Sequence, residues 1–455
     1  MTFDSSHAEV REPARNVPIF GEYDVVILGG GPAGLAAATS AARNGAGVLL
    51  VERYGFLGGM GTAAGVTNFC GLHANVFGEI KQVVHGVADD LLELIRTLDG
   101  LNPPHLVLGK IYAQAYDMSA LKCAADALLL DAGVNLLFHA LGTGVTMTED
   151  GDIESLLLET KSGRVAVRAR TFIDCSGDAD MAHWSGVAYE KGSAAGEMLY
   201  PTLMFKVGKV DAAKAGEAWR TIPEKMEKAQ AIGAYQFPRH GAVVRPMKNP
   251  YEWRVNVTQL AAPDGSAIDG TDAGALSAGE IEGRRQIVDY LRFLREQIPG
   301  FEEAYVLDIP PQLGIRETRR VVGEYMLTGD DVLGCARFED SIGVNGWPLE
   351  KHVAGNVVWE WPPIPESCGY NQLPYRMLLP RQRQKSQVSN LLVAGRCASM
   401  THDGQSAARV TGACFVMGEA AGTAAALALK ANISVHDVET SKLQEALTRQ
   451  GVFLG

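Results

Sequence analysis

Three glycines and one acid near the N-terminus have the spacing of a dinucleotide site. Gly29, Gly31 and Gly34 form a G-x-G-x-x-G pattern, and Glu52 follows the first of them by 52 − 29 = 23 residues. In such a pattern the first glycine permits a tight turn, the second lets the backbone approach a pyrophosphate, and the third lets a helix pack closely on a strand. The acid can accept hydrogen bonds from ribose hydroxyls. We therefore expect a bound dinucleotide, and this pattern alone does not decide between FAD and NAD.

The segments around these residues predict a strand, a helix and a second strand in that order. Residues 23–28 are a short apolar run rich in β-branched side chains, which is typical of a buried parallel strand. The alanine-rich segment after Gly34 predicts a helix, and residues 48–51 predict a strand that ends at Glu52. The N-terminus of that helix would offer free N–H groups and a partial positive charge to the phosphates.

A second strand followed by a helix is predicted near the C-terminus. Periodicity and turn signals predict helices at 89–98, 117–133, 278–297 and 411–429, and strands at 135–138, 153–159, 164–167, 171–175, 202–207, 253–260 and 391–395. The strand at 391–395 and the helix after it resemble the N-terminal arrangement. We predict an α/β protein with a discontinuous Rossmann-like dinucleotide-binding domain and an inserted α+β substrate domain. The predicted parts are an N-terminal arm (1–20), the first part of the binding domain (21–191), the substrate domain (192–369) and the second part of the binding domain (370–455).

Composition and charge narrow the class of protein. Apolar residues make up 47% and charged residues 21% of the chain, which is usual for a globular protein. The net charge of −12 argues against nucleic acid or an anionic membrane as a partner. The seven cysteines include no C-x-x-C pair, so we expect neither a disulfide framework nor a metal site. We expect a soluble protein, because no apolar run is long enough to span a membrane, and a cytoplasmic one, because the cysteines are expected to be reduced.

Five segments resemble a known family of flavoproteins. GFLGGMGTAAG (55–65) resembles the Gly-Gly-x-x-Thr/Ser loop of glutathione-reductase-like flavoproteins, and FIDCSGDAD (172–180) resembles their strand-plus-(A/S)-(T/S)-G element. GIRETRRVVGEYMLT (314–328), YNQLPYRMLLP (370–380) and residues 390–429 are similar to the FAD-dependent oxidoreductase family, which is related to succinate dehydrogenase and fumarate reductase flavoproteins. This resemblance implies that the dinucleotide is FAD and that the enzyme is an oxidoreductase. It implies little about the substrate.

The glycine pattern and the resemblance together predict the residues that bind FAD. They are Gly29, Gly31, Pro32, Ala33, Gly34, Glu52, Arg53, Gly59, Met60, Thr62, Gly177, Arg396, Gly412 and Ala413. The small residues of the helix at 411–429 would let it approach a flat ligand, and its N-terminus would stabilise negative charge on the N1–C2=O edge of reduced flavin. The alternative is an Ala/Gly helix packed tightly in the core.

Four residues are candidates for catalysis. Arg316, in a dense cluster of arginines, could anchor a substrate carboxylate or an oxyanion, although a salt-bridged corner is the alternative reading of that cluster. His402 and His352 are candidate bases or proton relays because the ordinary pKa of histidine is near neutral. Tyr375 could shape the boundary between flavin and substrate. We expect Cys70 to be a spectator, because it has no partner cysteine at C-x-x-C or C-x₄-C spacing.

The first functional hypothesis is an FAD-dependent dehydrogenase or oxidase that takes a hydride from a small organic substrate onto flavin N5. No second G-x-G-x-x-G element with its strand and acid occurs in the middle of the chain, so we expect no separate NAD(P)H domain. Oxygen, a quinone or a partner redox protein would then reoxidise the flavin. The alternatives are a flavin-dependent reductase of an activated C=C bond, an electron-carrier subunit, and an RNA-directed flavoprotein, which the acidic charge balance opposes. Covalent attachment of the flavin and a homo-oligomer are left open.

Overall fold

The computed structural model describes residues 10–382 and 388–455. Residues 1–9 of the predicted N-terminal arm lie outside the described residues. Residues 10–18 are mostly exposed and form no helix or strand. The predicted arm therefore ends two residues too late, because the first strand, β1, already begins at Ile19.

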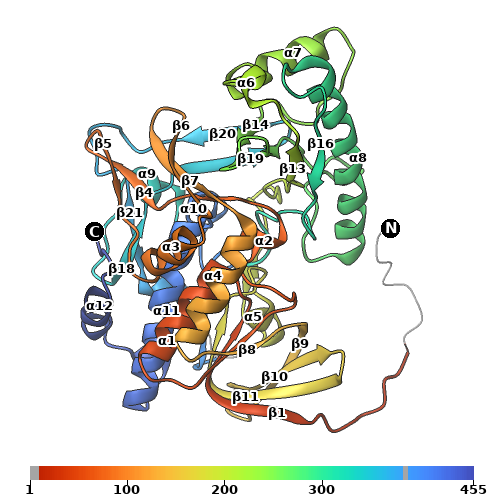
Figure 1. Ribbon diagram of the computed structural model, residues 1–455. Helices are drawn as coiled ribbons and strands as arrows, with labels where there is room; N and C mark the ends of the chain where they lie inside the picture. The colour runs from red at the N-terminus through yellow and green to blue at the C-terminus, as the bar shows by residue number, and fades with distance from the viewer. Residues whose placement is uncertain (1–9, 383–387) are drawn as a thin grey trace.

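A seven-stranded sheet forms the centre of the described part of the molecule (Figure 1). Its strands are β1 (Ile19–Leu28), β2 (Val48–Val51), β8 (Asn135–Leu137), β9 (Ala140–Met147), β10 (Ile153–Thr160), β11 (Gly163–Asp174) and β22 (Leu391–Val393). The pairs β8–β2, β2–β1, β1–β11 and β11–β22 are parallel, whereas β9, β10 and β11 form an antiparallel meander. The last four residues of β1 are buried, as its continuous apolar run predicts for a parallel strand covered on both faces. This parallel-rich sheet agrees with the predicted Rossmann-like class.

Strand β11 differs from the prediction, which divided it into strands at 164–167 and 171–175. The structure has one continuous strand, because β11 pairs with β1 along nearly its whole length. On its other side, its first half pairs with β10 and its last three residues pair with β22. The change of partner, rather than a break in the chain, explains the change in sequence pattern.

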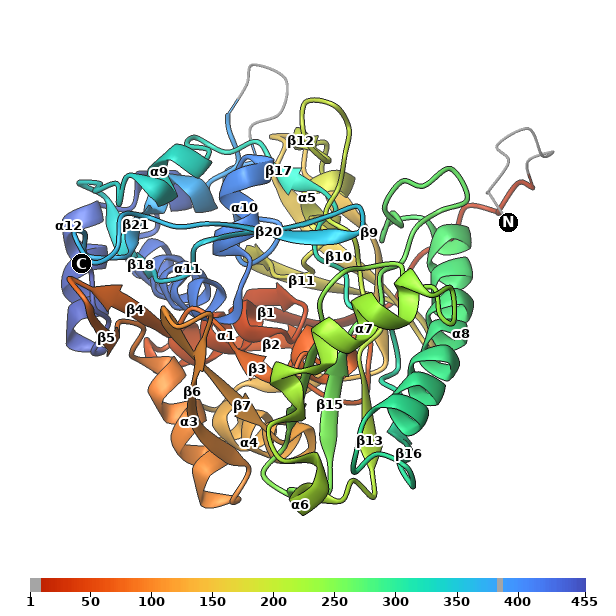
Figure 2. The same ribbon diagram turned by 90° about the horizontal axis from the view of Figure 1, so that it is seen from above.

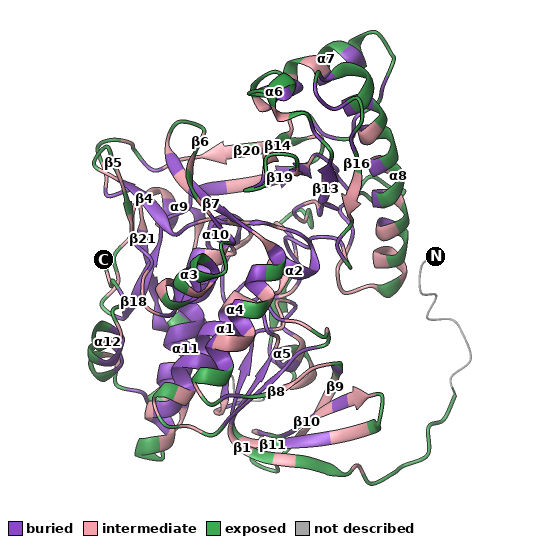
Figure 3. Ribbon diagram, in the orientation of Figure 1, coloured by how far each residue is buried: buried purple, intermediate pink, exposed green. Residues whose placement is uncertain are grey.

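Four helices gather in one group beside the sheet (Figure 1): α1 (Pro32–Arg43), α3 (Val87–Thr97), α4 (Met118–Asp131) and α11 (Thr411–Ala431). Helix α11 is buried along most of its length (Figure 3). A Cβ at Gly418 or Gly422 would collide with the carbonyl oxygen of Ala33 or Ala37, so these glycines let the backbones of α11 and α1 touch. Along most of α11 the small residues therefore serve helix packing, the alternative reading, rather than approach to a flat ligand.

Helix α11 is also the one helix of residues 10–382 and 388–455 that is long and apolar enough to cross a membrane by length and composition. Of its most apolar window, 89% is buried inside the structure. Gly, Thr and Glu419 interrupt its apolar run, so the helix does not stand out in the sequence as an uninterrupted apolar segment.

A second hydrophobic cluster lies between Leu203 and Ile315. It is built on a four-stranded antiparallel sheet in the order β14–β15–β13–β16 and on three helices. These elements are β13 (Phe205–Gly208), β14 (Val243–Pro246), β15 (Trp253–Asn256), β16 (Tyr305–Asp308), α6 (Ala212–Ala215), α7 (Ile222–Ala231) and α8 (Ala273–Gln297). Helix α8 begins five residues before the prediction because the Asp272 carboxylate accepts a hydrogen bond from Ala275 N and caps it. Figure 2 shows this unit on the opposite side of the molecule from α12 (Thr440–Arg449).

The other described strands are short and pair in twos and threes, and several short helices accompany them. The strand pairings are β3 (Asn68–Phe69) with β7 (Ile111–Tyr116) and β7 with β6 (Leu101–Val107), β4 (His73–Val76) with β5 (Glu79–Gln82), β12 (Tyr189–Glu190) with β17 (Arg320–Val321), β18 (Ser341–Asn345) with β21 (Asn371–Pro374), and β19 (Leu349–Val353) with β20 (Asn356–Glu360). The short helices are α2 (Met60–Ala63), α5 (Asp180–Trp184), α9 (Gly329–Leu333) and α10 (His402–Ala408).

Candidate active site

A cavity of about 590 Å³ lies at the carboxyl ends of four parallel strands. Strands β2, β1, β11 and β22 lie side by side, and the residues at their carboxyl ends, Val51, Leu28, Cys175 and Ala394, line it. Ligands of open α/β sheets bind at this edge. Further lining comes from the four-stranded sheet, so both hydrophobic clusters contribute to one cavity.

The glycine turn after β1 divides its tasks as the sequence predicts. Gly29 has φ +104°, which a side chain would strain. A Cβ at Gly34 would collide with the carbonyl oxygen of Gly29, so this glycine allows α1 to pack closely on the strand. Gly31 differs from both. It lines the cavity with φ −76°, and the nearest protein atom to a Cβ placed there would be 3.6 Å away, on Gly59.

The space that a side chain at position 31 would fill therefore belongs to the cavity. Gly31 is also the N-cap of α1, and no side chain among the described residues caps this helix. Uncapped N–H groups at a helix N-terminus, approached through a glycine, fit the pyrophosphate of a dinucleotide.

Glu52 has a second role that the sequence analysis missed. Its Oε2 accepts a hydrogen bond from Gly30 N at 2.8 Å, and its Oε1 accepts one from Tyr54 N at 3.0 Å. The carboxylate thus holds the glycine turn while it lines the cavity. Burial raises the pKa of Glu52, and the backbone hydrogen bonds from Tyr54 and Gly30 oppose this rise.

Other predicted cofactor residues line the same cavity: Pro32, Ala33, Arg53, Gly59, Met60, Gly177 and Arg396. Arg396 forms an ion pair with Asp178 at 3.0 Å. Its guanidinium fills the space beside Gly177, where a Cβ would crowd it. The first and last parts of the chain thereby meet at this point.

Four predicted cofactor residues do not line the cavity. Gly34 lies inside the turn, and Thr62 is buried with its hydroxyl donated to Leu57 O at 2.6 Å. A Cβ at Gly412 would collide with the Gly71 backbone, and Ala413 is fully buried. These small residues serve packing, whereas the residues of this turn that line the cavity are Val410, Thr411 and Cys414.

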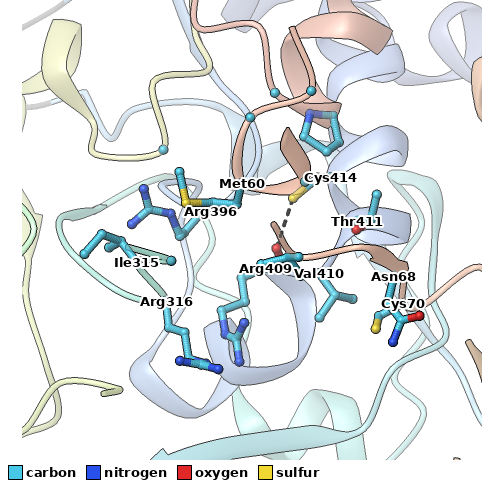
Figure 4. A pocket seen from close by; sticks show the side chains of 18 of the residues that line it. Met60, Asn68, Cys70, Ile315, Arg316, Arg396, Arg409, Val410, Thr411 and Cys414 are labelled. Atoms are coloured by element: carbon cyan, nitrogen blue, oxygen red, sulfur yellow. Dashed lines mark hydrogen bonds between the residues drawn. The ribbon is translucent and has the colours of Figure 1, made fainter. Parts of the chain in front are cut away.

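Arginines without acidic partners line one part of the cavity. Arg316, 9% exposed, donates to Tyr200 O at 2.7 Å, and its guanidinium lies close to that of Arg409 (Figure 4). Arg239, 3% exposed, donates only to Asn256 in the part of the chain that the structure describes. Within that part, none of the three forms a salt bridge. Burial and the neighbouring charges of Arg409 and Arg239 hold the pKa of Arg316 well below its usual range.

Glu350 and His352 form a hydrogen-bonded pair on β19 beside these arginines. Glu350 Oε1 lies 3.0 Å from His352 Nε2, and its Oε2 accepts from the Trp347 indole at 2.9 Å. Burial would raise the pKa of Glu350, but the hydrogen bond from His352, the charge of Arg409 and the Trp347 hydrogen bond outweigh it and lower the pKa to about 2. Burial, with the charge of Arg316, lowers the pKa of His352 well below its ordinary value although Glu350 opposes this.

A second group of basic side chains lies in the same cavity around Arg254 of β15. Arg254 is 2% exposed, and it donates to Thr67 O at 2.9 Å and to the Asn68 side chain. Cys70 lies near it, and burial raises the pKa of the Cys70 thiol to about 12. This thiol stays protonated at neutral pH, as a spectator would.

Two predicted catalytic residues lie elsewhere, which corrects the sequence prediction. Tyr375 is buried in the core, and its hydroxyl donates to Val435 O at 2.8 Å. His402 lines a separate hollow, and its Nδ1 lies 2.9 Å from Glu317, which is paired with Arg320. The salt-bridged corner considered for the arginine cluster is thus correct for Arg320, whereas Arg316 reaches the cavity.

Several charged residues that line the cavity are not among the predicted site residues: Arg239, Arg254, Glu350 and Arg409. Glu350 could have been predicted from the sequence, because residues two apart on a strand share a face and Glu350 stands two residues before the candidate His352. Arg239 and Arg254 could not, since they come from segments with no recognisable motif.

Comparison with known proteins also indicates an FAD-dependent oxidoreductase. A family model described as FAD dependent oxidoreductase matches residues 24–447. Digeranylgeranylglycerophospholipid reductase 1 of Methanothermobacter thermautotrophicus is 27% identical over 177 residues, which cover 36% of this chain and 42% of that protein, less than half its length.

Two solved structures are similar over most of the chain. A geranylgeranyl bacteriochlorophyll reductase-like protein of Thermoplasma acidophilum has 14% identity over 95% of this chain and 84% of its own, with a TM-score of 0.47. The p-nitrophenol 4-monooxygenase of Pseudomonas putida has 13% identity over 95% and 86%, with a TM-score of 0.47.

Proposed function

This chain belongs to the FAD-dependent oxidoreductase family, and we propose that it oxidises a small organic substrate that carries a carboxylate. When bound, the flavin supplies a hydride acceptor at N5 and passes the electrons on to oxygen, a quinone or a partner redox protein. The protein supplies binding, orientation and a base.

The observation that carries this proposal is the group of buried arginines without acidic partners. Removing a charge from water costs several kcal/mol unless a partner compensates it. Glu350 offers one negative charge near Arg316, Arg239 and Arg409, so most of that compensation is left to a ligand. The planar guanidinium fork matches a carboxylate in charge and geometry, which supports an acid as the substrate.

His352 would take the proton that leaves with the hydride. Because the ionised Glu350 can only accept hydrogen bonds, Nε2 of His352 donates to it and Nδ1 is the free acceptor. A substrate C–H bond would give its hydride to the flavin, and the neighbouring O–H or N–H would give its proton to Nδ1, leaving C=O or C=N. Glu350 would then stabilise the imidazolium.

We also propose that the elements between residues 192 and 369 form the substrate-binding part of the enzyme. They contribute Arg239, Arg254, Arg316 and His352, whereas the cofactor residues at Gly31 and Arg396 come from the flanking parts. This division favours the predicted domain order.

A reductase of an activated C=C bond is the second candidate. The low pKa of Arg316 is what a guanidinium needs in order to act as a proton donor, and the curated relative is named a reductase. In such a reduction the same arginine group would bind the substrate carboxylate.

Substitution of Arg316 tests the proposal. With a carboxylate substrate found by anaerobic flavin bleaching, Arg316→Gln should lower kcat/KM by about 10- to 100-fold, because hydrogen bonds to charged groups contribute about 1.5–3 kcal/mol. FAD content should stay at the wild-type level. The control is Arg284→Gln, which removes an exposed arginine that is paired with Glu280 on α8. An unchanged kcat/KM for Arg316→Gln would refute the anchoring role.

A further inference from the structure

The second basic group of the cavity has more charge than its surroundings neutralise. Arg254 donates to neutral partners only: Thr67 O, the Asn68 amide oxygen and, at 3.3 Å, His105 Nε2. Its Nε is buried without a hydrogen-bond partner among the described residues. Arg254 forms no salt bridge within residues 10–382 and 388–455, so its charge is uncompensated there.

A second arginine lies directly opposite Arg254. Arg245 of β14 is its cross-strand partner in the β14–β15 register, and Arg245 also lines the cavity. Like charges directly opposite on a sheet are destabilising. The pair therefore costs stability unless an anion lies between the two side chains or beside them.

The environment of His105 supports the same conclusion. Burial, with the charges of Arg254 and Arg245, lowers the pKa of His105 to about 4. His105 is thus neutral at pH 7, and its Nε2 accepts from Arg254 instead of adding a charge. The positive charge of this group resides on the two arginines.

The charges of the whole cavity indicate how many anions it takes. Arg316, Arg409 and Arg239 form the group beside His352, and Arg245 and Arg254 form the second group. Within these two groups, five guanidinium groups face one carboxylate, Glu350, which leaves 5 − 1 = 4 positive charges. The other charged lining residues, Arg53 and Arg396 against Glu52 and Asp180, balance one another. A substrate with one carboxylate would leave most of the positive charges of the two groups uncompensated. The phosphates of FAD belong at the glycine turn, at the N-terminus of α1.

We propose that the substrate is dianionic, with one anionic group at Arg316, Arg409 and Arg239 and a second, carboxylate or phosphate, at the Arg245–Arg254 pair. This inference rests on the proposed function and specifies its substrate class. A carboxylate and a phosphate both fit the second subsite, because guanidinium forks bind either group.

Matched pairs of anions test the second subsite in the FAD-loaded enzyme. The probes are succinate against butyrate, glutarate against valerate, and phosphoglycolate against glycolate, each titrated against the absorbance of the flavin. We expect at least one dianion to bind about tenfold or more tightly than its monoanion. The pair that shows this advantage separates a second carboxylate from a phosphate.

Variants assign the advantage to the arginine pair. Arg245→Gln should remove it and leave the Kd of the monoanion within about twofold, whereas Arg245→Lys should keep part of it. Arg245 suits this test because its recorded contact is with the face of the Trp219 ring, so its loss breaks no structural hydrogen bond in the described part of the chain. The control is Arg284→Gln, an exposed arginine paired with Glu280 on α8.

Two different results separate failure of this inference from failure of the proposed function. If no dianion binds more tightly than its monoanion, or if Arg245→Gln and Arg254→Gln both keep the advantage, the second subsite is refuted. If Arg316→Gln leaves the binding of every anion unchanged, the proposed function fails as well.

Discussion

At the residue scale, the three glycines of the turn have different physical requirements. Gly34 is required by the protein itself, because the Gly29 carbonyl oxygen occupies the place of a side chain. Gly31 is not, since a Cβ there would meet no protein atom closer than 3.6 Å and its φ suits any residue. The fold therefore does not require glycine at position 31, whereas the predicted approach of the pyrophosphate does.

Gly31→Ala should fold normally and lose FAD. The added methyl group would occupy space that the pyrophosphate needs, while the backbone stays unstrained. We expect an unchanged circular dichroism spectrum and a far lower flavin-to-protein ratio after purification. Gly34→Ala is the contrasting variant and should fold poorly. A Gly31→Ala protein that retains full FAD would show that the pyrophosphate does not pass this residue.

His352→Gln should lower kcat by about 10²- to 10⁴-fold, the usual contribution of a general base. Binding of a carboxylate inhibitor should change little, because the arginines hold it. The matched variant Glu350→Gln should give a smaller loss, since it weakens the orientation of the ring and the stabilisation of the imidazolium but leaves the base in place. Equal kcat for wild type and His352→Gln would remove this histidine from the proposed reaction.

The pH profile of the wild type gives an independent check on His352. Its neutral form accepts the proton, and burial together with Arg316 lowers its pKa well below the usual value of 6.5. The active form therefore persists as the pH falls through 6.5, and kcat/KM should decline only at lower pH. A base with an inflection at 6.5 or above would contradict the low pKa.

At the scale of elements, Glu419 joins α11 to the N-terminus of α3. This buried carboxyl accepts a hydrogen bond from Val87 N at 3.0 Å and so satisfies the N-terminus of α3. Burial, with the charges of Asp90 and Asp89, raises the pKa of Glu419 to about 8, although the Val87 hydrogen bond and Arg43 oppose the rise. A protonated acid thus lies inside the packed helix group at neutral pH.

Glu419→Gln should flatten the dependence of stability on pH. Because the folded pKa of about 8 lies above the unfolded value of 4.5, the contribution is complete below pH 4.5 and is lost as pH rises through 8. The wild type should lose on the order of a few kcal/mol relative to the variant between these limits, measured by urea unfolding at several pH values. Parallel curves for the two proteins would mean that Glu419 is ionised in the fold.

How far the sequence predicts these elements depends on how local their cause is. The sequence predicts helix α11 to within two residues, the last six residues of β1 and the presence of α1, because apolar periodicity and the glycine turn are local signals. The two halves of β11 were separated wrongly, since only pairing with β10 and then β22 explains its changing pattern. Small residues were ambiguous for the same reason: Gly418 fits helix packing and ligand approach equally well in a sequence, and only the neighbouring helix decides.

At the scale of the whole molecule, the cofactor site joins both ends of the chain, and the proposed substrate site joins both hydrophobic clusters. The glycine turn could be predicted because its residues are adjacent in sequence. The arginine groups could not, because Arg239, Arg254, Arg316 and Arg409 become neighbours only after folding. The chain has a net charge of −12, and this cationic cavity is therefore a local feature that composition conceals.

FAD should stabilise the whole molecule, because it would hold α1, near the N-terminus, and α11, near the C-terminus, against one sheet. At about 100 times its Kd, a ligand that binds only the folded state adds about 2.7 kcal/mol. Thermal unfolding of FAD-free protein should therefore shift to higher temperature when FAD is added. Gly31→Ala should show a much smaller shift, and the absence of a shift in the wild type would argue against a site formed by both ends.

The most direct test of the account is anaerobic bleaching of the bound flavin near about 450 nm by small acids and their neutral amides. We predict that at least one hydroxy or amino acid bleaches the flavin, that its amide does not, and that Arg316→Gln slows the bleaching by about 10- to 100-fold. If acid and amide bleach the flavin at equal rates, or if only dithionite bleaches it, the central claim of an oxidoreductase that selects an anionic substrate is contradicted.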